Sequence, residues 1–325
     1  MQQTRWAVLG PGVISTDFVE GLRHSEHGML HAVGSSSPER AAAFAAKQGA
    51  AASGTYADII ARDDVDAVYI GTVHTTHVEL AIRALDAGKA VLCEKPASPT
   101  LAETQRILDA AARAKRPFLE AFKNRFGPFA EAVRSLVAGG ELGAPARLEA
   151  ACGFAAGTRT GRLFDPELAG GAILDVGCYP VSLAVEIAAA AGLPFDAPEL
   201  ISSTAEHDAG VETDAAALVE FGGFEAQLST SIVRTLDATA TLRFTGGEVI
   251  LPSPWGSRVD SARSLIVRRD GDEQTIEVPI VQPMAAEADA VSRALADGRC
   301  EVPEMPWSHT AAVARVLTLW RYAAS

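Results

Sequence analysis

Short apolar runs alternate with longer amphipathic runs through the first 122 residues of the chain. Parallel strands need long crossover connections, usually helices, so this alternation is typical of βαβ units that build a parallel sheet. The expected strands cover residues 6–9, 30–34, 67–71, 90–93 and 117–122, and the expected helices cover 15–23, 39–48, 77–87 and 101–114. Residues 1–122 are therefore predicted to form a doubly wound α/β domain with a parallel sheet.

The pattern changes after a helix expected at residues 128–138, because short apolar runs then follow one another with only turns between them. The runs lie at 146–151, 200–205, 215–221, 226–232, 238–244, 265–267 and 274–278. They predict a large, mostly antiparallel open sheet. One long helix is expected from 171 to about 191, and two more close the chain at 285–296 and 309–323. Residues 123–325 are therefore predicted to form a second, α+β domain.

Length and charge exclude several classes of protein. The 325 residues fit two domains at about 150 residues each. Counts of 28 basic and 41 acidic residues give a net charge of −13, which argues against a nonspecific grip on nucleic acid or on an anionic membrane. The richest apolar stretch, residues 181–193, contains Glu186 and is too short to span a membrane, so it predicts a buried helix. Any anionic ligand must then be bound by a local group of hydrogen-bond donors or positive charges.

The cysteines and the N-terminus both bear on location. The four cysteines contain neither a CxxC pair nor the framework of a secreted domain, so buried free thiols are expected. The apolar stretch at residues 5–9 turns at once into Gly10-Pro11-Gly12, which is too short for a signal peptide. These features predict a cytoplasmic protein.

A glycine-rich turn follows the first expected strand. Gly10-Pro11-Gly12-Val13-Ile14-Ser15 closes the strand and opens a helix, which is the context that a dinucleotide-binding Rossmann loop requires. Gly10 permits the tight turn, Gly12 lets the backbone approach a pyrophosphate, and the free N–H groups of the helix N-terminus favour negative charge. Ser15 replaces the third glycine, where a small residue still allows close packing of helix on strand. The alternative is a purely structural turn.

The end of the second expected strand indicates which dinucleotide binds. An NAD enzyme would place Asp or Glu there, whereas this chain has Ser35 and Ser36 with Arg40 in the first turn of the next helix. Serine hydroxyls can donate to a phosphate, and Arg40 can supply the positive charge. This set favours NADP over NAD, with Glu39 weakening the preference. The alternative is that Ser37 caps the helix and Arg40 is merely solvated.

The fourth expected strand ends in Glu94-Lys95-Pro96. Ligands bind outside the carboxyl ends of strands in an open parallel sheet, so this charged pair is expected to face the cofactor. The alternative is a surface ion pair before a turn. His74 and His77, after the third of these strands, have HxxH spacing, but no third ligand with suitable spacing follows. The sequence therefore predicts no metal site.

These motifs together resemble a known family. The Gly10-Pro11-Gly12 turn, residues 87–96 and residues 170–179 look like the successive signatures of the glucose-fructose oxidoreductase and inositol dehydrogenase (Gfo/Idh/MocA) family. The resemblance covers essentially the whole chain. Residues 71–77, Glu120-Ala121-Phe122 with Arg125-Phe126, and residues 177–180 are most similar to the branch of dimeric dihydrodiol dehydrogenase and NADP-dependent D-xylose 1-dehydrogenase.

The resemblance implies an oxidoreductase that transfers a hydride between nicotinamide and a secondary or anomeric carbinol of a sugar or cyclic diol. It places Lys95, Asp175 and Tyr179 in the catalytic positions. Asp175 and Tyr179 are four residues apart on one expected helix, hence on one face, and Lys95 is expected to approach from the other domain. Tyr179 would then exchange the hydroxyl proton, Lys95 would polarise the oxygen, and Asp175 would orient a substrate hydroxyl or the lysine.

The resemblance also implies the remaining contacts. The residues expected to bind the cofactor are Gly10, Gly12, Val13, Ile14, Ser35, Ser36, Arg40, Thr72, His74, His77, Glu94, Lys95 and Arg125. His77 is expected to cap the following helix. The residues expected to bind the substrate are Lys95, Lys123, Asp175, Tyr179 and Trp255. Lys123 stands where the dihydrodiol branch has a tryptophan, which favours a polar sugar over an apolar diol. Trp255 supplies a remaining aromatic wall or packs on the sheet edge.

Two other functions stay open on the same fold. One is a catalytically silent, nucleotide-binding regulatory protein, and the other is a relative that uses bound NAD to hydrolyse a glycoside. The intact set of Lys95, Asp175 and Tyr179 argues against the first, and the lack of an obvious acid and base pair of carboxylates argues against the second. The expected partners are a small-molecule substrate and further copies of this chain, paired through the sheet of the second domain. No nucleic acid or membrane partner is expected.

Overall fold

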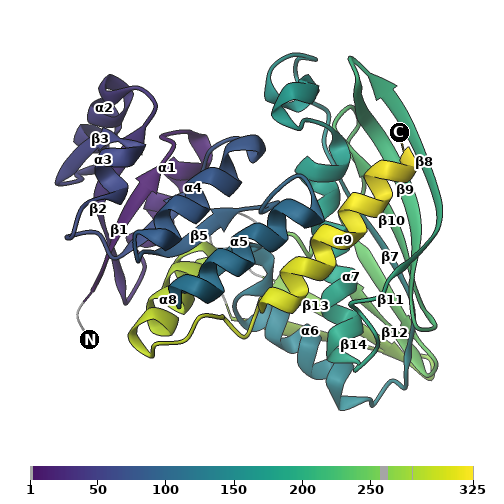
Figure 1. The fold of residues 1–325 in the computed structure, drawn as a ribbon. Helices are drawn as coiled ribbons and strands as arrows, with labels where there is room; N and C mark the ends of the chain where they lie inside the picture. The colour runs from purple at the N-terminus through teal and green to yellow at the C-terminus, as the bar shows by residue number, and fades with distance from the viewer. Residues whose placement is uncertain (1–2, 257–262, 280, 325) are drawn as a thin grey trace. The chain divides into compact units, whose positions relative to one another are not determined.

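The computed structural model describes residues 3–256, 263–279 and 281–324 (Figure 1). Their contacts form two compact units. Unit 1 is Met1–Ser98, Ala102–Lys123 and Gln282–Trp307, and unit 2 is Pro99–Leu101, Asn124–Val281 and Ser308–Ser325. Unit 1 therefore includes a segment near the C-terminus, whereas the sequence suggested one boundary at 122/123. Whether residues 123–325 fold as a domain of their own stays a prediction.

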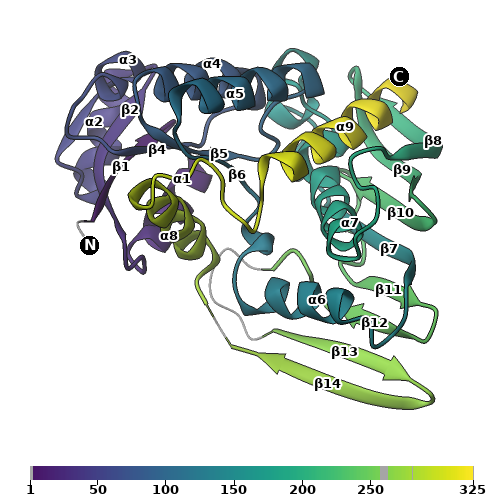
Figure 2. The ribbon, with the colours of Figure 1, turned by 60° about the horizontal axis from the view of Figure 1, so that its bottom comes forward.

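Unit 1 is built on a six-stranded, wholly parallel sheet in the order β3-β2-β1-β4-β5-β6. The strands are β1 (Thr4–Leu9), β2 (Gly28–Ser35), β3 (Ala52–Thr55), β4 (Ala67–Ile70), β5 (Ala90–Glu94) and β6 (Phe118–Ala121). The helices are α1 (Val13–Leu22), α2 (Pro38–Gln48), α3 (Tyr56–Ile60), α4 (His74–Asp86), α5 (Leu101–Ala114) and α8 (Pro283–Ala296). In Figure 2, α4 and α5 cover one face of the sheet, and α1 and α8 cover the other.

Strand order fixes where a ligand can enter unit 1. The order reverses between β1 and β4, so the crossovers from these two strands leave on opposite sides and open a crevice at the carboxyl ends. The central strands are fully buried; Ala7, Val8 and Leu9 are wholly shielded from solvent. This arrangement confirms the predicted parallel sheet with helices on both faces.

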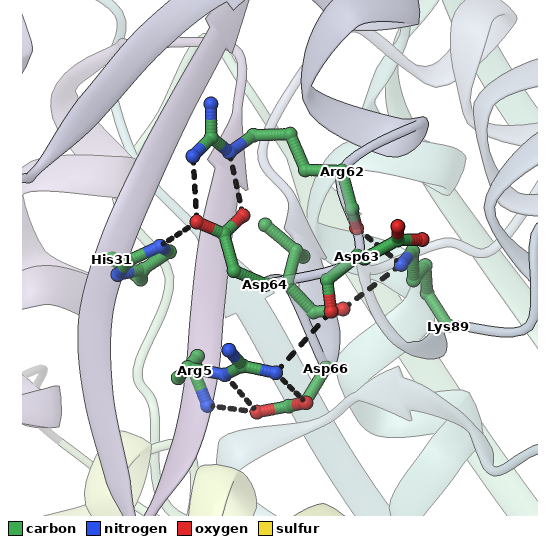
Figure 3. Close-up of polar contacts among 8 residues, drawn as sticks. Arg5, His31, Arg62, Asp63, Asp64, Asp66 and Lys89 are labelled. Atoms are coloured by element: carbon green, nitrogen blue, oxygen red, sulfur yellow. Dashed lines mark hydrogen bonds and ion pairs between the residues drawn. The ribbon is translucent and has the colours of Figure 1, made fainter.

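The amino ends of the same strands are joined by an ionic network (Figure 3). The Arg5 guanidinium donates to both oxygens of Asp66 at 2.9 Å and thereby lowers the pKa of that carboxyl. Arg62 donates to both oxygens of Asp64 at 2.7 and 2.6 Å, and His31 Nε2 lies 3.0 Å from the same carboxylate. Lys89 Nζ donates to backbone carbonyls of the loop before β4, including that of Arg62 at 2.6 Å. The network lies at the amino ends of the strands, opposite the expected cofactor site at their carboxyl ends. Its contacts join neighbouring strands and loops, so we assign it to the stability of the sheet and not to ligand binding.

Unit 2 contains an eight-stranded sheet in the order β14-β13-β12-β11-β7-β10-β9-β8. All neighbouring strands are antiparallel except β7 and β10, which confirms the predicted mostly antiparallel sheet. The strands are β7 (Pro145–Gly153), β8 (Glu199–Asp208), β9 (Val211–Phe221), β10 (Phe224–Ser231), β11 (Ala240–Phe244), β12 (Gly247–Leu251), β13 (Arg263–Arg269) and β14 (Asp272–Val278). Helices α6 (Pro128–Gly139), α7 (Cys178–Ala190) and α9 (Trp307–Ala324) lie on one face (Figures 1 and 2).

The other face of this sheet carries a row of charged side chains, one from each strand and all in register. From β8 to β14 in spatial order they are Glu199, Glu220, Glu225, Arg147, Arg243, Glu248, Arg268 and Glu273. Arg147 donates to Glu225 at 2.9 Å, and Arg268 donates to Glu273 at 2.8 Å. Strict alternation of buried and part-exposed residues along β9 and β10 puts this row on the side away from the helices.

The long apolar helix of unit 2 lies in the core. Within the described chain, Pro166–Ala190 is the one helical stretch whose length and composition could suit a membrane, with a mean hydropathy of 1.6 in its most apolar window. However, 89% of that window is buried inside the protein, as in the core helix of a soluble protein. The structure thus agrees with the buried helix that the sequence predicts here.

Candidate active site

The glycine loop after β1 depends on close backbone contacts. Gly10 has a φ of +92°, and a Cβ there would lie 2.6 Å from Thr72 Cγ2, so a larger residue would be strained. The Gly10 N–H donates to the Gly34 carbonyl at 2.9 Å, and Ser15 Oγ donates to the Gly10 carbonyl at 2.6 Å. Ser15, which stands at the third position of the motif, therefore closes the loop by a buried hydrogen bond.

The N-terminus of α1 suits a phosphate. Gly12 is its N-cap, and within the described chain no side chain caps this end of the helix. A Cβ added to Gly12 would meet nothing within 4 Å, and the Val13 side chain is 76% exposed. The first backbone N–H groups of a helix carry partial positive charge and need acceptors, so a pyrophosphate fits this end of α1.

The end of β2 combines a helix cap with exposed donors. Ser37 Oγ accepts from the Arg40 N–H at 3.3 Å and donates to Glu39 at 2.7 Å, which lowers the pKa of Glu39. The Glu39 carboxylate is thus directed to Ser37. Ser36 and the Arg40 side chain are exposed, while Ser35 is buried and accepts from the Ser37 N–H. This set of donors with a guanidinium fits a 2′-phosphate better than a ribose hydroxyl pair.

Buried contacts hold the loop that carries Lys95. His77 Nδ1 lies 3.0 Å from the Pro96 carbonyl, and its Nε2 lies 3.3 Å from the Thr72 carbonyl. On the other side of the loop, the Ala97 N–H donates to Glu120 at 2.8 Å. His77 lies inside the first turn of α4, whose N-cap is Val73, so it braces two loops and is not the helix cap that the sequence suggested.

A further group of ionisable side chains lies beside this loop in unit 1. Tyr69, stacked on Phe18, donates to Glu94 at 2.7 Å. Glu287 of α8 is fully buried, and this burial, with the charge of Glu94, raises the pKa of Glu287; the charge of Lys123 opposes the shift. Sequence reasoning missed Glu287 because α8 lies far along the chain. The signal was an acid at core spacing between Met284 and Val291 on one helix face.

His74 is buried next to His77, with ring centroids 5.8 Å apart. Within the described residues, no group of three or more His, Cys, Asp or Glu side chains is placed to hold a metal ion.

In unit 2, Asp175 and Tyr179 lie where a π-helix passes into α7. The π-helix spans Ile173–Gly177, and such segments often mark functional sites. Arg162 donates to Asp175 at 2.8 Å. The Tyr179 ring lies 6.0 Å from that of Trp255, and the Trp255 indole N–H donates to the Ala151 carbonyl at 2.9 Å. Trp255 therefore packs on β7, an inner strand of the sheet, and lies beside Tyr179; its role as an aromatic wall for the substrate stays a prediction.

A buried carboxylate anchors the start of this helix. Glu212 accepts a hydrogen bond from the Ile173 N–H, and burial raises the pKa of Glu212. Gly171 has a φ of +108°, and a Cβ there would lie 2.6–2.8 Å from the Glu212 carboxylate. Arg321 of α9 lies 3.8 Å from Glu212. Glycine at 171 is thus required by the close approach of this carboxylate, a contact that the sequence did not predict.

Arg125 occupies a buried place in unit 2. Its guanidinium is wholly shielded from solvent and donates to the Ser182 hydroxyl at 2.9 Å and carbonyl at 2.7 Å. His309 Nδ1 lies 3.1 Å from the same guanidinium. Because a guanidinium only donates, this nitrogen accepts; burial and the neighbouring arginines lower the pKa of His309 to about 3. The role expected for Arg125 at the cofactor stays a prediction.

The expected site residues thus gather in two sets. Unit 1 brings together the glycine loop, Thr72, His77 and the Glu94-Lys95-Pro96 loop, with Ser35, Ser36 and Arg40 at the end of β2. Unit 2 brings together Asp175, Tyr179 and Trp255. The joint action of Lys95 with the set in unit 2 stays a prediction.

Comparisons with known proteins cover the whole chain. Residues 4–122 match an oxidoreductase family with an NAD-binding Rossmann fold, and residues 130–250 match the GFO/IDH/MocA C-terminal domain. The chain is 30% identical over 332 residues to trans-1,2-dihydrobenzene-1,2-diol dehydrogenase of Xenopus tropicalis, covering 97% of this chain and 96% of that protein. It is 27% identical to D-xylose 1-dehydrogenase (NADP(+)) of Hypocrea jecorina, covering 94% and 88%.

A solved structure has the same fold. A 3-ketoreductase from Actinomadura kijaniata, in complex with NADP and TDP-benzene, superposes with a TM-score of 0.89 at 23% identity, covering 99% of this chain and 98% of that one. At this identity the likeness concerns the fold alone, whereas the two domain matches together cover more than half of the chain. The chain therefore belongs to the Gfo/Idh/MocA family of oxidoreductases.

Proposed function

We propose that this protein is an NADP-dependent dehydrogenase or reductase that acts on a secondary or anomeric carbinol of a sugar or cyclic diol. One observation carries the proposal: a continuous chain of contacts in unit 1 joins the glycine loop to the loop of Lys95. Gly10 lies against Thr72, His77 lies against the carbonyls of Thr72 and Pro96, and Pro96 follows Lys95. One histidine, His77, thus braces both the segment next to the glycine loop, which would bind the cofactor, and the loop of Lys95, which would act beside it.

The residues of unit 1 fit NADP. The N-terminus of α1 would hold the pyrophosphate, and Ser36 and Arg40 would hold the 2′-phosphate. The names of relatives support this choice, since the Hypocrea xylose dehydrogenase and a scyllo-inositol 2-dehydrogenase of Bacillus subtilis, 30% identical to this chain, are both NADP(+) enzymes. NAD remains the second choice.

The proton step falls to Tyr179 and Lys95. The nicotinamide, when bound, takes or gives the hydride at the carbinol carbon. A free phenol titrates near pH ~10, and a nearby ammonium favours the phenolate, so the role proposed for Lys95 includes favouring the phenolate of Tyr179. In oxidation Tyr179 takes the hydroxyl proton while Lys95 polarises the oxygen, and Asp175 orients a neighbouring hydroxyl or the lysine. In reduction Tyr179 returns the proton.

The substrate favoured is a polar sugar. Lys123 is buried in unit 1 and carries a charge where the dihydrodiol branch has an aromatic side chain. Trp255 supplies one aromatic face beside Tyr179, which suits the apolar face of a pyranose ring. Among the relatives, the enzymes named for xylose and scyllo-inositol act on polyhydroxylated rings.

The test measures NADPH formation across a panel of pyranoses, inositols and cyclic diols with purified protein. Tyr179→Phe keeps the ring and removes the ionisable hydroxyl, so turnover should fall about 10²- to 10⁴-fold. Lys95→Ala should fall at least as far, and the two losses should not add. NADP binding should persist in both variants. Turnover above about half of the wild-type value in Tyr179→Phe would overturn the role of Tyr179 as the base. No NADPH formation by the wild type with any member of the panel would support a nucleotide-binding regulator in place of an enzyme.

We also propose that copies of this chain pair through the outer face of the sheet in unit 2. An isologous interface must be self-complementary, and the charged row there carries an acidic end, Glu220 and Glu225, next to Arg147 and Arg243. The test is sedimentation velocity at low and high salt. Arg147→Glu with Arg243→Glu should weaken the dimer, and a wild-type monomer at all protein concentrations would exclude it.

A cytoplasmic location is proposed on the cysteines. All four lie in the described part of the chain, and none forms a disulfide. Cysteines that form no disulfide are typical of proteins in reducing compartments.

A further inference from the structure

Asp175 has a cationic neighbour, Arg162, which lies outside the motifs that carry the family resemblance. Arg162 Nη1 donates to Asp175 Oδ1 at 2.8 Å. The Asp175 side chain is 7% exposed and that of Arg162 is 50% exposed, so the pair has one buried and one solvated end. A carboxylate with little access to water depends on nearby charge to stay ionised.

The backbone fixes Arg162 in this place. Arg162 opens a short 3-10 turn, Arg162–Phe164, whose Phe164 is buried in a cluster with apolar residues of the π-helix. A Cβ at Gly170 would lie 2.7 Å from the Arg162 carbonyl and 2.6 Å from that of Leu163, so only glycine permits this approach. The N–H of the next residue donates to the Leu163 carbonyl at 2.9 Å. The turn is therefore docked on the helix that carries Asp175.

We infer that Arg162 is a positioning residue for the reaction, which holds the Asp175 carboxylate ionised and oriented toward its partner. The inference rests on the proposed function, in which Asp175 accepts a hydrogen bond from a substrate hydroxyl or from Lys95. A protonated Asp175 would donate where it must accept. Loss of the Arg162 charge should therefore reduce the active form of the enzyme at the acid end of its pH range.

Other charged and titratable groups face the same helix in unit 2. Its own residues Tyr179 and Cys178 lie next to Asp175, and the Cys178 thiol donates to the Asp175 carbonyl. From the sheet, β7 brings Cys152 to the same cluster. Glu212 of β9 and Arg321 of α9 meet at the start of the π-helix. These groups are unchanged in the variants below, so a change in pH dependence reports on Arg162.

A second arginine of the same loop provides a matched control. Arg159 is 65% exposed and pairs with Asp208 at 2.7 Å. It has the same chemistry and a similar setting but forms its ion pair away from Asp175. Arg159→Met should therefore leave both the rate and its pH dependence as in the wild type.

The experiment measures kcat/KM against pH for the wild type, Arg162→Met, Arg162→Lys and Arg159→Met, on the best substrate of the panel. In Arg162→Met the acid limb should move up by about one pH unit, so kcat/KM at the acid end falls about tenfold. Arg162→Lys keeps the charge and should restore most of the wild-type profile. Melting temperatures of all variants are compared, and Arg162→Gln, which removes the charge but keeps a hydrogen-bond donor, is measured in the same way and replaces Arg162→Met if that variant does not fold.

Asp175→Asn separates the possible failures. If Asp175→Asn leaves kcat/KM and its acid limb unchanged, the role of Asp175 in the proposed function is wrong. If Asp175→Asn lowers kcat/KM while Arg162→Met follows the wild-type profile, the proposed function stands and this inference is overturned. An equal shift in Arg162→Met and Arg159→Met also overturns it, because general surface charge would then explain the effect.

Discussion

Arg40 lies exposed in the first turn of α2, three residues after the N-cap Ser37. Arg40→Ala should weaken NADP binding by about 1.5–3 kcal/mol, the scale of a charge-assisted hydrogen bond, because the 2′-phosphate loses its cationic partner. NAD lacks that phosphate, so its affinity should hardly change. Titration of both cofactors by quenching of tryptophan fluorescence measures the difference.

Arg23→Ala is the control for this prediction. Arg23 is an exposed arginine at the end of α1 that pairs with Glu20. The Arg23→Ala variant should bind NADP and NAD as tightly as the wild type does. Equal losses for NADP and NAD in Arg40→Ala would mean that Arg40 does not recognise the phosphate.

At the scale of single residues, the sequence predicted side chains that belong to local motifs and missed those brought in by tertiary contacts. Gly10, Gly12 and Arg40 could be found because strand, turn and helix follow one another directly in the chain. Arg162 could not, since nothing in its neighbours along the chain reveals the carboxylate that it meets. Glu287 could be suspected as a buried acid from its spacing in α8, but the sequence does not reveal the Glu94 carboxylate near it.

Among the elements, the start of the π-helix carries a strong constraint, because Gly171 there lies against the Glu212 carboxylate. Gly171→Ala should destabilise the protein by about 1–3 kcal/mol, because the new Cβ would overlap the Glu212 carboxylate and strain a positive φ. Gly192→Ala is the control, since Gly192 has a φ of +71° with nothing within 4 Å of the added Cβ. Urea unfolding measures both. Equal losses would show that backbone conformation, and not the carboxylate, governs this position.

The accuracy of the element predictions follows from periodicity. Helix α5 begins and ends where the sequence predicts, because its apolar face is regular and Glu103 stands in its first turn. Strand β3 was missed because Ala52–Thr55 contains no apolar run, and β12 was missed because Gly247–Leu251 lies directly after the turn that ends β11. The π-helix was not predicted; the residue that meets the chain just before it, Glu212, comes from a strand far along the sequence.

For the molecule as a whole, acid stability should depend on the network at the amino edge of the sheet in unit 1. Arg5 lowers the pKa of Asp66 below its ordinary value of 3.8, so the folded state binds the proton of this group less readily than the unfolded chain does. Asp66 thus stabilises the fold above about pH 4, and this contribution is lost as pH falls through its lowered pKa. Asp66→Asn should be less stable at pH 7, and the difference should shrink toward pH 2.

Thermal unfolding across this pH range measures the effect. Asp109→Asn, at an exposed position of α5, is the control and should follow the wild type throughout. If the difference in stability between Asp66→Asn and the wild type stays constant with pH, the loss of stability comes from altered packing or hydrogen bonding and not from the lost charge.

Residues 282–307 belong to unit 1 although they follow most of unit 2 in the sequence. This arrangement bears on how such a protein can evolve. Helix α8 packs on α1, and Asp289 accepts hydrogen bonds from Ser25 and from the backbone of the loop before β2. A single recombination event near residue 123 would therefore join a foreign α8 to this parallel sheet. Exchange of substrate specificity between relatives needs three crossovers, near 123, 281 and 307, so that α8 stays with its own parallel sheet and α9 moves with the sheet of unit 2.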